Sequence, residues 1–266
     1  RKVPICNVPQ ITYGSFALDD GNYTISEDEY KKIINESPSS IEFIRPFIGG
    51  REMLRSVKRY CIWLKGVSPN YLRKDKLIMN KVNKVREWRA NSNRQNTKKL
   101  ADTPTLFAEI RQQNSNYLAF PTVSSENRNF IPIKYLSPDV IASNQLYTIP
   151  NTNLYHFGIL TSTMHMAWVR YIAGRLKSDY RYSSSVVYNN YPWPKNPSEK
   201  NIKTVETKAQ KVLDTRAEFP ESSLADLYDP LTMPPKLVKA HQELDRAVDL
   251  CYRPQAFTNE TARIEF

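Results

Sequence analysis

The chain has 266 residues, of which 40% are hydrophobic and 24% charged, an ordinary globular composition that allows one large or two smaller domains. No apolar run approaches the ~18–20 residues of a membrane span, so no membrane partner is expected. Cys6, Cys61 and Cys251 form no CxxC pair, which disfavours zinc sites and disulfide frameworks and favours reduced thiols in the cytoplasm. The sequence begins at Arg1 without a signal peptide, which suggests a piece of a longer protein.

Positive charge is concentrated in one stretch of the chain. The net charge is +11, and residues 51–130 contain seventeen Lys and Arg against six Asp and Glu, while the other residues balance. Because phosphate contacts dominate nucleic-acid affinity, a positive field confined to one third of a chain indicates a polyanionic partner. The alternative is a basic helix face exposed to solvent.

The first quarter of the chain alternates turns, strands and one helix. Ser26 and Glu29 form a capping box that predicts a helix from Glu27 to about Asn35. The residues that follow predict a strand, a turn and a second strand, at 41–47, 49–50 and 59–64.

A long polar helix is predicted from about Pro69 to Leu100. Apolar residues at helical spacing give it a narrow stripe: Leu77, Ile78, Val82, Val85 and Trp88. Its last turns, Arg89 to Lys99, are almost wholly polar. Short strands are expected at 117–123, 130–135 and 145–149, so residues 1–150 combine strands and helices.

After Pro150 the pattern becomes mostly helical. An apolar helix is predicted over 153–176, and a connection rich in Tyr, Ser and Pro follows at 180–197. Further helices are expected at 199–218, 223–228 and 235–252. The chain is therefore predicted to be an α+β protein with a mixed part, residues 1–150, and a helical C-terminal region, residues 151–266.

Catalytic motifs are missing. The seven glycines form neither a GxG or GxGxxG turn nor a phosphate loop. Asn190–Trp193 superficially resembles the Asp/Asn-Pro-Pro-aromatic tetrapeptide that grips a flipped base, but Tyr191 replaces the first proline, and a packed turn is the simpler interpretation. His156, His165 and His241 fit no HExxH or Ser/His/Asp pattern. We expect no catalytic residue, metal or cofactor in this chain.

Side chains suited to nucleic-acid recognition lie in the last turns of the predicted long helix, from Arg89 to Lys99. Asn93 and Arg94 can donate to base edges. Basic residues along the same part of the chain are candidates for phosphate contacts: Arg73, Lys74, Lys98, Lys99 and Arg111. A helix end exposed to solvent is the alternative.

A second recognition segment lies between two predicted strands. Glu126 and Arg128 are two residues apart, so in an extended segment they face the same side. Glu accepts from cytosine N4 and Arg donates to guanine, so the pair is suited to reading one C·G pair. Ser124 and Ser125, just before them, are candidates for phosphate contacts. The alternative is an ion pair that supports the loop.

Several longer motifs, in one order along the chain, resemble the C-terminal third of the MmeI-like family. They begin near Tyr13–Ser15 and cover nearly the whole chain: residues 99–104, the Ile131–Ile133 segment after Ser124–Arg128, Leu154–Gly158 with Met164–Arg170, Tyr188–Pro194, and Ala225–Pro234. Members of that family combine a nuclease part, which some relatives lack, an adenine methyltransferase core, a target-recognition domain and a C-terminal region.

The resemblance implies that residues 1–150 are a target-recognition domain and 151–266 the C-terminal region. It implies double-stranded DNA as partner and, upstream in the same polypeptide, a core that binds S-adenosylmethionine and methylates adenine N6, as in type II restriction–modification. It favours base readout by Glu126 and Arg128, and no catalytic residue is carried over, so the chain by itself is expected to be inactive. A stand-alone RNA-binding protein, disfavoured because RNP-type aromatic pairs and a GXXG loop are missing, and a protein–protein scaffold are the alternatives.

Overall fold

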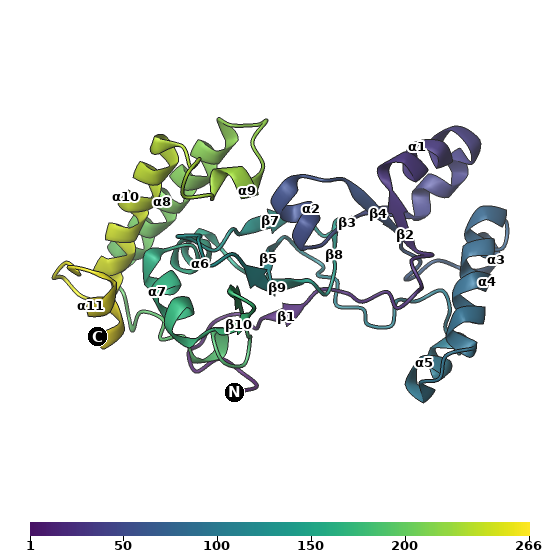
Figure 1. Ribbon diagram of the computed structural model, residues 1–266, viewed down its shortest axis with the longest axis horizontal. Coiled ribbons are helices and arrows are strands. Elements are labelled where there is room, and N and C mark those ends of the chain that lie inside the picture. The colour runs from purple at the N-terminus through teal and green to yellow at the C-terminus, as the bar shows by residue number, and fades with distance from the viewer.

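Two separate hydrophobic clusters organise the chain. The computed structural model describes all 266 residues, with sixteen buried residues in one cluster and thirty-eight in the other. The smaller cluster is the core of residues 17–110, here called the distal lobe, which lies at one end of an elongated molecule (Figure 1). A central sheet joins this lobe to C-terminal helices at the other end, so the predicted α+β class is confirmed. None of the helices is both long and apolar enough to cross a membrane.

A four-stranded sheet, in the order β2-β4-β3-β8, supports the distal lobe. Its strands are β2 (Thr24–Ser26), β3 (Ile44–Ile48), β4 (Arg59–Ile62) and β8 (Ile141–Ala142). The predicted first helix is confirmed as α1 (Glu27–Glu36), whose first turn is capped by a hydrogen bond from Glu29 N to Ser26 Oγ at 3.2 Å.

Two predictions at the start of this sheet need correction. The strand expected from Ile41 begins only at Ile44, because Pro38 starts a 3-10 helix, η1 (Pro38–Phe43), and its fixed φ suits the first position of a helix. The expected turn at Gly49–Gly50 is the start of a short helix, α2 (Gly50–Arg55). Met53 of α2 belongs to the larger core cluster, so this helix packs toward the central sheet.

The long polar helix predicted over 69–100 is wrong as one element. The chain forms α3 (Pro69–Leu72), α4 (Lys76–Ala90), α5 (Gln95–Lys99) and a 3-10 turn, η2 (Leu100–Asp102). Asp75 starts α4 anew, because one carboxylate oxygen accepts from Ile78 N at 2.9 Å and the other from Ser40 Oγ at 2.6 Å. The cap therefore separates α3 from α4.

Arg89 lies in the last turn of α4 and binds the chain that follows this helix. Its guanidinium is fully buried and donates all five N–H groups to backbone carbonyls: Nε to Leu18, Nη1 to Leu100 and Thr103, and Nη2 to Ala17 and Leu106. Burial lowers the pKa of this guanidinium. The interpretation of Arg89 as part of a polar recognition surface is therefore wrong, because it holds residues 100–106 against α4.

The central sheet has the order β1-β9-β5-β7 and is antiparallel throughout. Its strands are β1 (Thr12–Tyr13), β9 (Leu146–Pro150), β5 (Tyr117–Pro121) and β7 (Lys134–Leu136). Every residue of β5 is buried, as expected for a central strand covered on both faces. The strands predicted at 117–123 and 145–149 are confirmed, whereas the one predicted from Phe130 begins at Lys134.

The C-terminal helices pack onto this sheet. They are α6 (Leu154–Leu160), α7 (Thr163–Ile172), α8 (Glu199–Ala217), α9 (Leu224–Leu227), α10 (Pro235–Tyr252) and α11 (Glu260–Glu265), and the helices predicted at 199–218 and 235–252 are confirmed. A Cβ on Gly158 would lie 2.6 Å from Val205 Cγ1, so glycine allows α6 to approach α8 closely. The larger cluster runs without a break from β5 into α10.

The apolar helix predicted over 153–176 is wrong in two places. Ser162 interrupts it, because its hydroxyl accepts from His165 N and so caps a new helix, α7. The last three residues belong to a strand, β10 (Gly174–Leu176), which pairs with β11 (Asp179–Arg181). β11 in turn pairs with β6 (Val123–Ser124).

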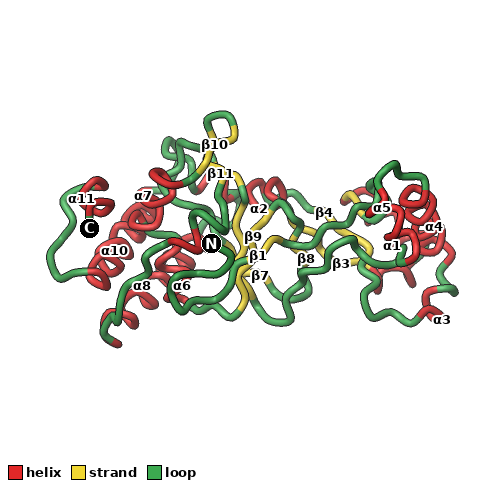
Figure 2. The backbone as a smooth tube through the Cα atoms, turned by 90° about the horizontal axis from the view of Figure 1, so that it is seen from below, coloured by secondary structure: helices red, strands yellow, loops and turns green.

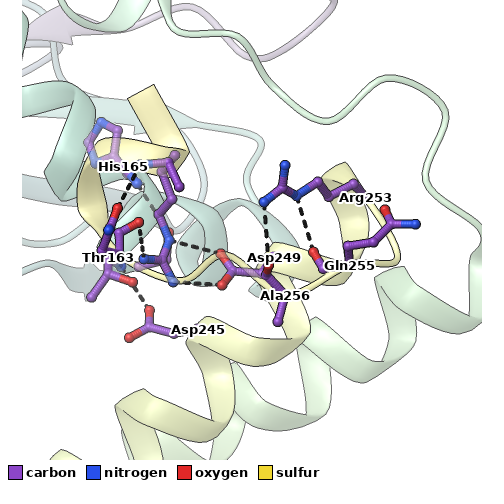
Figure 3. Close-up of polar contacts among 11 residues, drawn as sticks. Thr163, His165, Asp245, Asp249, Arg253, Gln255 and Ala256 are labelled. Atoms are coloured by element: carbon purple, nitrogen blue, oxygen red, sulfur yellow. Dashed lines mark hydrogen bonds and ion pairs between the residues drawn. The ribbon is translucent and has the colours of Figure 1, made fainter. Parts of the chain in front are cut away.

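A buried carboxylate joins α10 to the start of α7 (Figure 3). Asp245 accepts a hydrogen bond from Thr163 N at 2.8 Å, and one turn later Asp249 accepts two from the Arg263 guanidinium. The pKa of Asp245 is raised to about 7, mainly by burial and also by the nearby Asp249 charge, against the opposing effect of the hydrogen bonds to Thr163 and of the Arg263 charge. In the folded protein this group therefore holds its proton more tightly than in the unfolded chain.

Asp245→Asn should stabilise the protein increasingly as pH rises. The pKa is raised on folding, so the wild type loses stability between about pH 4, where the unfolded carboxyl titrates, and about pH 7, where the folded one does. The unfolding free energy of the variant relative to wild type should grow by up to roughly 4 kcal/mol across that range and then level off. Urea titrations at several pH values measure it. Asp214→Asn, at an exposed position of α8, is the control, and parallel curves for wild type and Asp245→Asn would contradict the assignment.

Candidate nucleic-acid interface

Most basic side chains of residues 51–130 are exposed and form no ion pair within the protein. Of the seventeen, Arg89 is buried, Arg128 is half-buried, and four pair with carboxylates: Lys58, Arg59, Lys81 and Arg111. The other eleven are exposed with no carboxylate within 4.0 Å: Arg51, Arg55, Lys65, Arg73, Lys74, Lys76, Lys84, Arg86, Arg94, Lys98 and Lys99. Ion pairing within the protein therefore leaves most of this charge unneutralised.

Six of the predicted site residues lie on or directly beside the helices of the distal lobe. Arg73 and Lys74 precede α4, whereas Asn93, Arg94, Lys98 and Lys99 follow it, and all six are exposed. At about 1.5 Å per residue, the fifteen residues of α4 separate the two groups by roughly 20 Å. A single DNA-binding surface therefore includes both groups of residues only if it follows the whole length of α4.

The other predicted residues lie at the central part of the molecule. Arg111 is half-buried, pairs with Glu109 and lies over the Tyr13 ring. Ser124 is 3% exposed and its hydroxyl has no hydrogen-bond partner in the protein, so of the two serines only Ser125 is open to a phosphate.

Glu126 and Arg128 occupy a tight turn and not an extended segment. Arg128 N donates to Ser125 O at 3.2 Å, which places Glu126 and Asn127 at the centre of the turn. The prediction that Glu126 and Arg128 face the same side of an extended segment is therefore wrong, because strand β6 ends at Ser124.

No ion pair joins Glu126 to Arg128. The Glu126 carboxylate is half exposed and lies 4.0 Å from Arg175 Nη1, whereas no carboxylate approaches the Arg128 guanidinium within 4.0 Å. Burial lowers the pKa of Arg128, while Asp179 and Asp229 oppose this shift. Both charged groups thus keep hydrogen-bonding capacity for an external partner.

The β10–β11 hairpin lies directly beside this turn, which the sequence pattern did not predict. Ser124 of β6 pairs with Tyr180 of β11, and Glu126 N donates to Asp179 Oδ1 at 3.3 Å. Figure 2 shows the hairpin projecting from the body of the molecule. A Gly-rich or Asn-Gly turn would have signalled it, but the turn residues are Lys177 and Ser178, with Lys177 in the left-handed region at φ 57°.

Groups with catalytic potential are used structurally. Asn190 donates to the carbonyls of Ser185 and Val186, and Tyr191 and Trp193 are buried, so the Asn190–Trp193 segment is a packed turn as predicted. Burial lowers the pKa of His165 to about 4, and its ring contacts Leu160 O and Tyr182 Oη. No three His, Cys, Asp or Glu side chains are grouped to hold a metal ion.

Two known proteins are similar to this chain over nearly its whole length. A solved structure of the type IIL restriction–modification enzyme MmeI in complex with DNA superposes with a TM-score of 0.95 at 44% identity, over 99% of this chain and 35% of that one. DNA methyltransferase A of Bacillus subtilis (strain 168) is 36% identical over the whole chain, which spans 30% of that protein. The chain thus covers about a third of these relatives.

Two family models divide the chain between them. The model of the MmeI target recognition domain matches residues 1–195, and that of the MmeI C-terminal domain matches residues 197–266. The two matches meet inside the connection between the β10–β11 hairpin and α8. Together they show that this chain belongs to the MmeI family, as its target-recognition and C-terminal domains.

Proposed function

We propose that this chain is the sequence-specific double-stranded DNA recognition module of a larger adenine-N6 DNA methyltransferase of a restriction–modification system. The observation that carries the proposal is the set of eleven exposed basic side chains without carboxylate partners, in a chain that belongs to the MmeI family. Such side chains bind phosphates, release counterions and position a protein on a duplex.

Within this proposal, residues 1–150 carry most of the recognition surface; the target-recognition match continues to residue 195, and the helices that follow support this surface. Arg73, Lys74, Lys98, Lys99, Arg111 and Ser125 contact the sugar–phosphate backbone. Glu126, Arg128, Asn93 and Arg94 read base edges in the major groove. Asn93 and Arg94 are suited to this because both are exposed between α4 and α5 and their side chains have no partner.

The remaining two thirds of the parent protein would supply the chemistry. The solved relative contains DNA and the curated relative is a DNA methyltransferase, and each is about three times as long as this chain. We place S-adenosylmethionine and the base-flipping site in that upstream core, which is then the second partner of this chain. The recognition module would close over the duplex opposite the core.

Binding of this chain to a short duplex should be weak and strongly salt-dependent. If about 4–6 phosphates are contacted, log K should fall with log[salt] at a slope of about −4 to −5. Fluorescence anisotropy with labelled duplex at several salt concentrations measures the slope. Single-stranded RNA of equal length is the competitor that tests the RNA-binding alternative. An affinity that is the same at low and high salt would contradict the proposal.

A further inference from the structure

The β10–β11 hairpin presents an unusual set of side chains. Leu176 at its tip is 51% exposed, and Arg175 and Lys177 on either side of it, with Arg181 at the base of the hairpin, are also exposed. No carboxylate lies within 4.0 Å of Lys177 or Arg181. β10 is an edge strand, since the sheet order is β10-β11-β6.

We infer that this hairpin is a DNA-contacting ribbon that enters the duplex groove beside the Glu126–Arg128 turn, with Lys177 and Arg181 contacting backbone phosphates. The inference rests on the proposed function. A two-stranded β ribbon fits the major groove of B-DNA. One face of the hairpin meets the turn, because Glu126 N donates to Asp179 and Arg175 lies 4.0 Å from the Glu126 carboxylate. A duplex read by that turn therefore meets the hairpin.

Arg175 has a different role from its neighbours. Its guanidinium lies 3.9 Å from the Tyr180 ring centroid, and Nη1 approaches Glu126. Nη1 also donates to Ser178 O at 2.8 Å, so the Arg175 guanidinium is engaged within the hairpin. Lys177 and Arg181 have no such contacts and are free to bind phosphates.

The hairpin lies on the same side of the molecule as α5, which carries Lys98 and Lys99 of the distal lobe. In Figure 1 the hairpin and α5 both lie in the lower half of the molecule, and in Figure 2 both lie in its upper half. The hairpin, beside the central sheet, and α5, in the distal lobe, thus lie on the same side of the molecule in both views. A single duplex that spans this side contacts Lys98 and Lys99 at one end and the hairpin at the other.

The double variant Lys177→Ala/Arg181→Ala tests the inference in the whole chain. Loss of two phosphate contacts should make the salt slope shallower by about 1.8 and weaken duplex binding about tenfold or more at 0.1 M salt. The matched control is Lys200→Ala/Lys203→Ala, which removes the same charge from exposed positions of α8. It should leave the slope within about 0.5 of wild type. Far-UV circular dichroism establishes that each variant is folded.

The outcomes separate this inference from the proposed function. A wild type that binds duplex with a steep salt slope, and a hairpin variant with the same slope and affinity, would overturn the role of the hairpin alone. Equal losses in the hairpin and α8 variants would also overturn it, because they would reflect net charge only. A wild type that does not bind duplex at all would overturn both the hairpin role and the proposed function.

Discussion

Replacing Arg89 by methionine should destabilise the protein by about 3–5 kcal/mol, because five carbonyls each lose a donor and two of them are left without any. The carbonyls of Leu18 and Leu106 accept from no other group of the protein. Arg89→Lys should also destabilise, since an ammonium has three donors and cannot reproduce the planar fork. Urea-induced unfolding followed by circular dichroism measures both effects.

Arg86→Met is the matched control for this experiment. Arg86 lies on α4 one turn earlier and is exposed without a carboxylate partner, so its replacement should change stability by less than about 0.5 kcal/mol. Equal stabilities of Arg89→Met and Arg86→Met would show that the buried guanidinium contributes no net stability. Because Arg89 holds residues 100–106 against α4, its loss should also weaken duplex binding through α5.

The double substitution Glu126→Lys/Arg128→Asp should change which base pair is preferred at one position. It places a donor where an acceptor stood and the reverse, so the contacts with a C·G pair are replaced by contacts with another pair. Losing one good base contact costs about 1–3 kcal/mol of discrimination. Selection of duplexes from a randomised library by wild type and variant, followed by sequencing, measures the preference at each position.

Lys98→Ala/Lys99→Ala is the control for that selection. Both lysines are exposed on α5 and are proposed phosphate contacts, so their loss should lower affinity about evenly across sequences. If the Glu126/Arg128 variant is folded and binds, yet selects the same sequence as wild type at every position, then the turn has only a structural role. A preference altered at one position, with the others unchanged, supports base readout.

The elements that the sequence predicted well depend on local interactions. The helix after Ser26 follows from a hydroxyl that accepts from an amide three residues on, and the helices at 199–218 and 235–252 follow from apolar residues at helical spacing. The location of the positive charge in residues 51–130 was also readable from the sequence. So was the order of motifs that resembles the MmeI family.

Tertiary contacts decided what the sequence pattern could not. Asp75 separates α3 from α4 partly through Ser40, thirty-five residues away, and Arg89 binds carbonyls as far away as Ala17. Strand pairing of β6 with β11 places the hairpin beside Glu126, although the two segments are fifty-three residues apart at their shared hydrogen bond. Local periodicity carries no information on such partners, because the free energy of these contacts arises only once distant segments meet. The charge of the candidate interface was thus readable from the sequence, whereas its shape was set by long-range pairing.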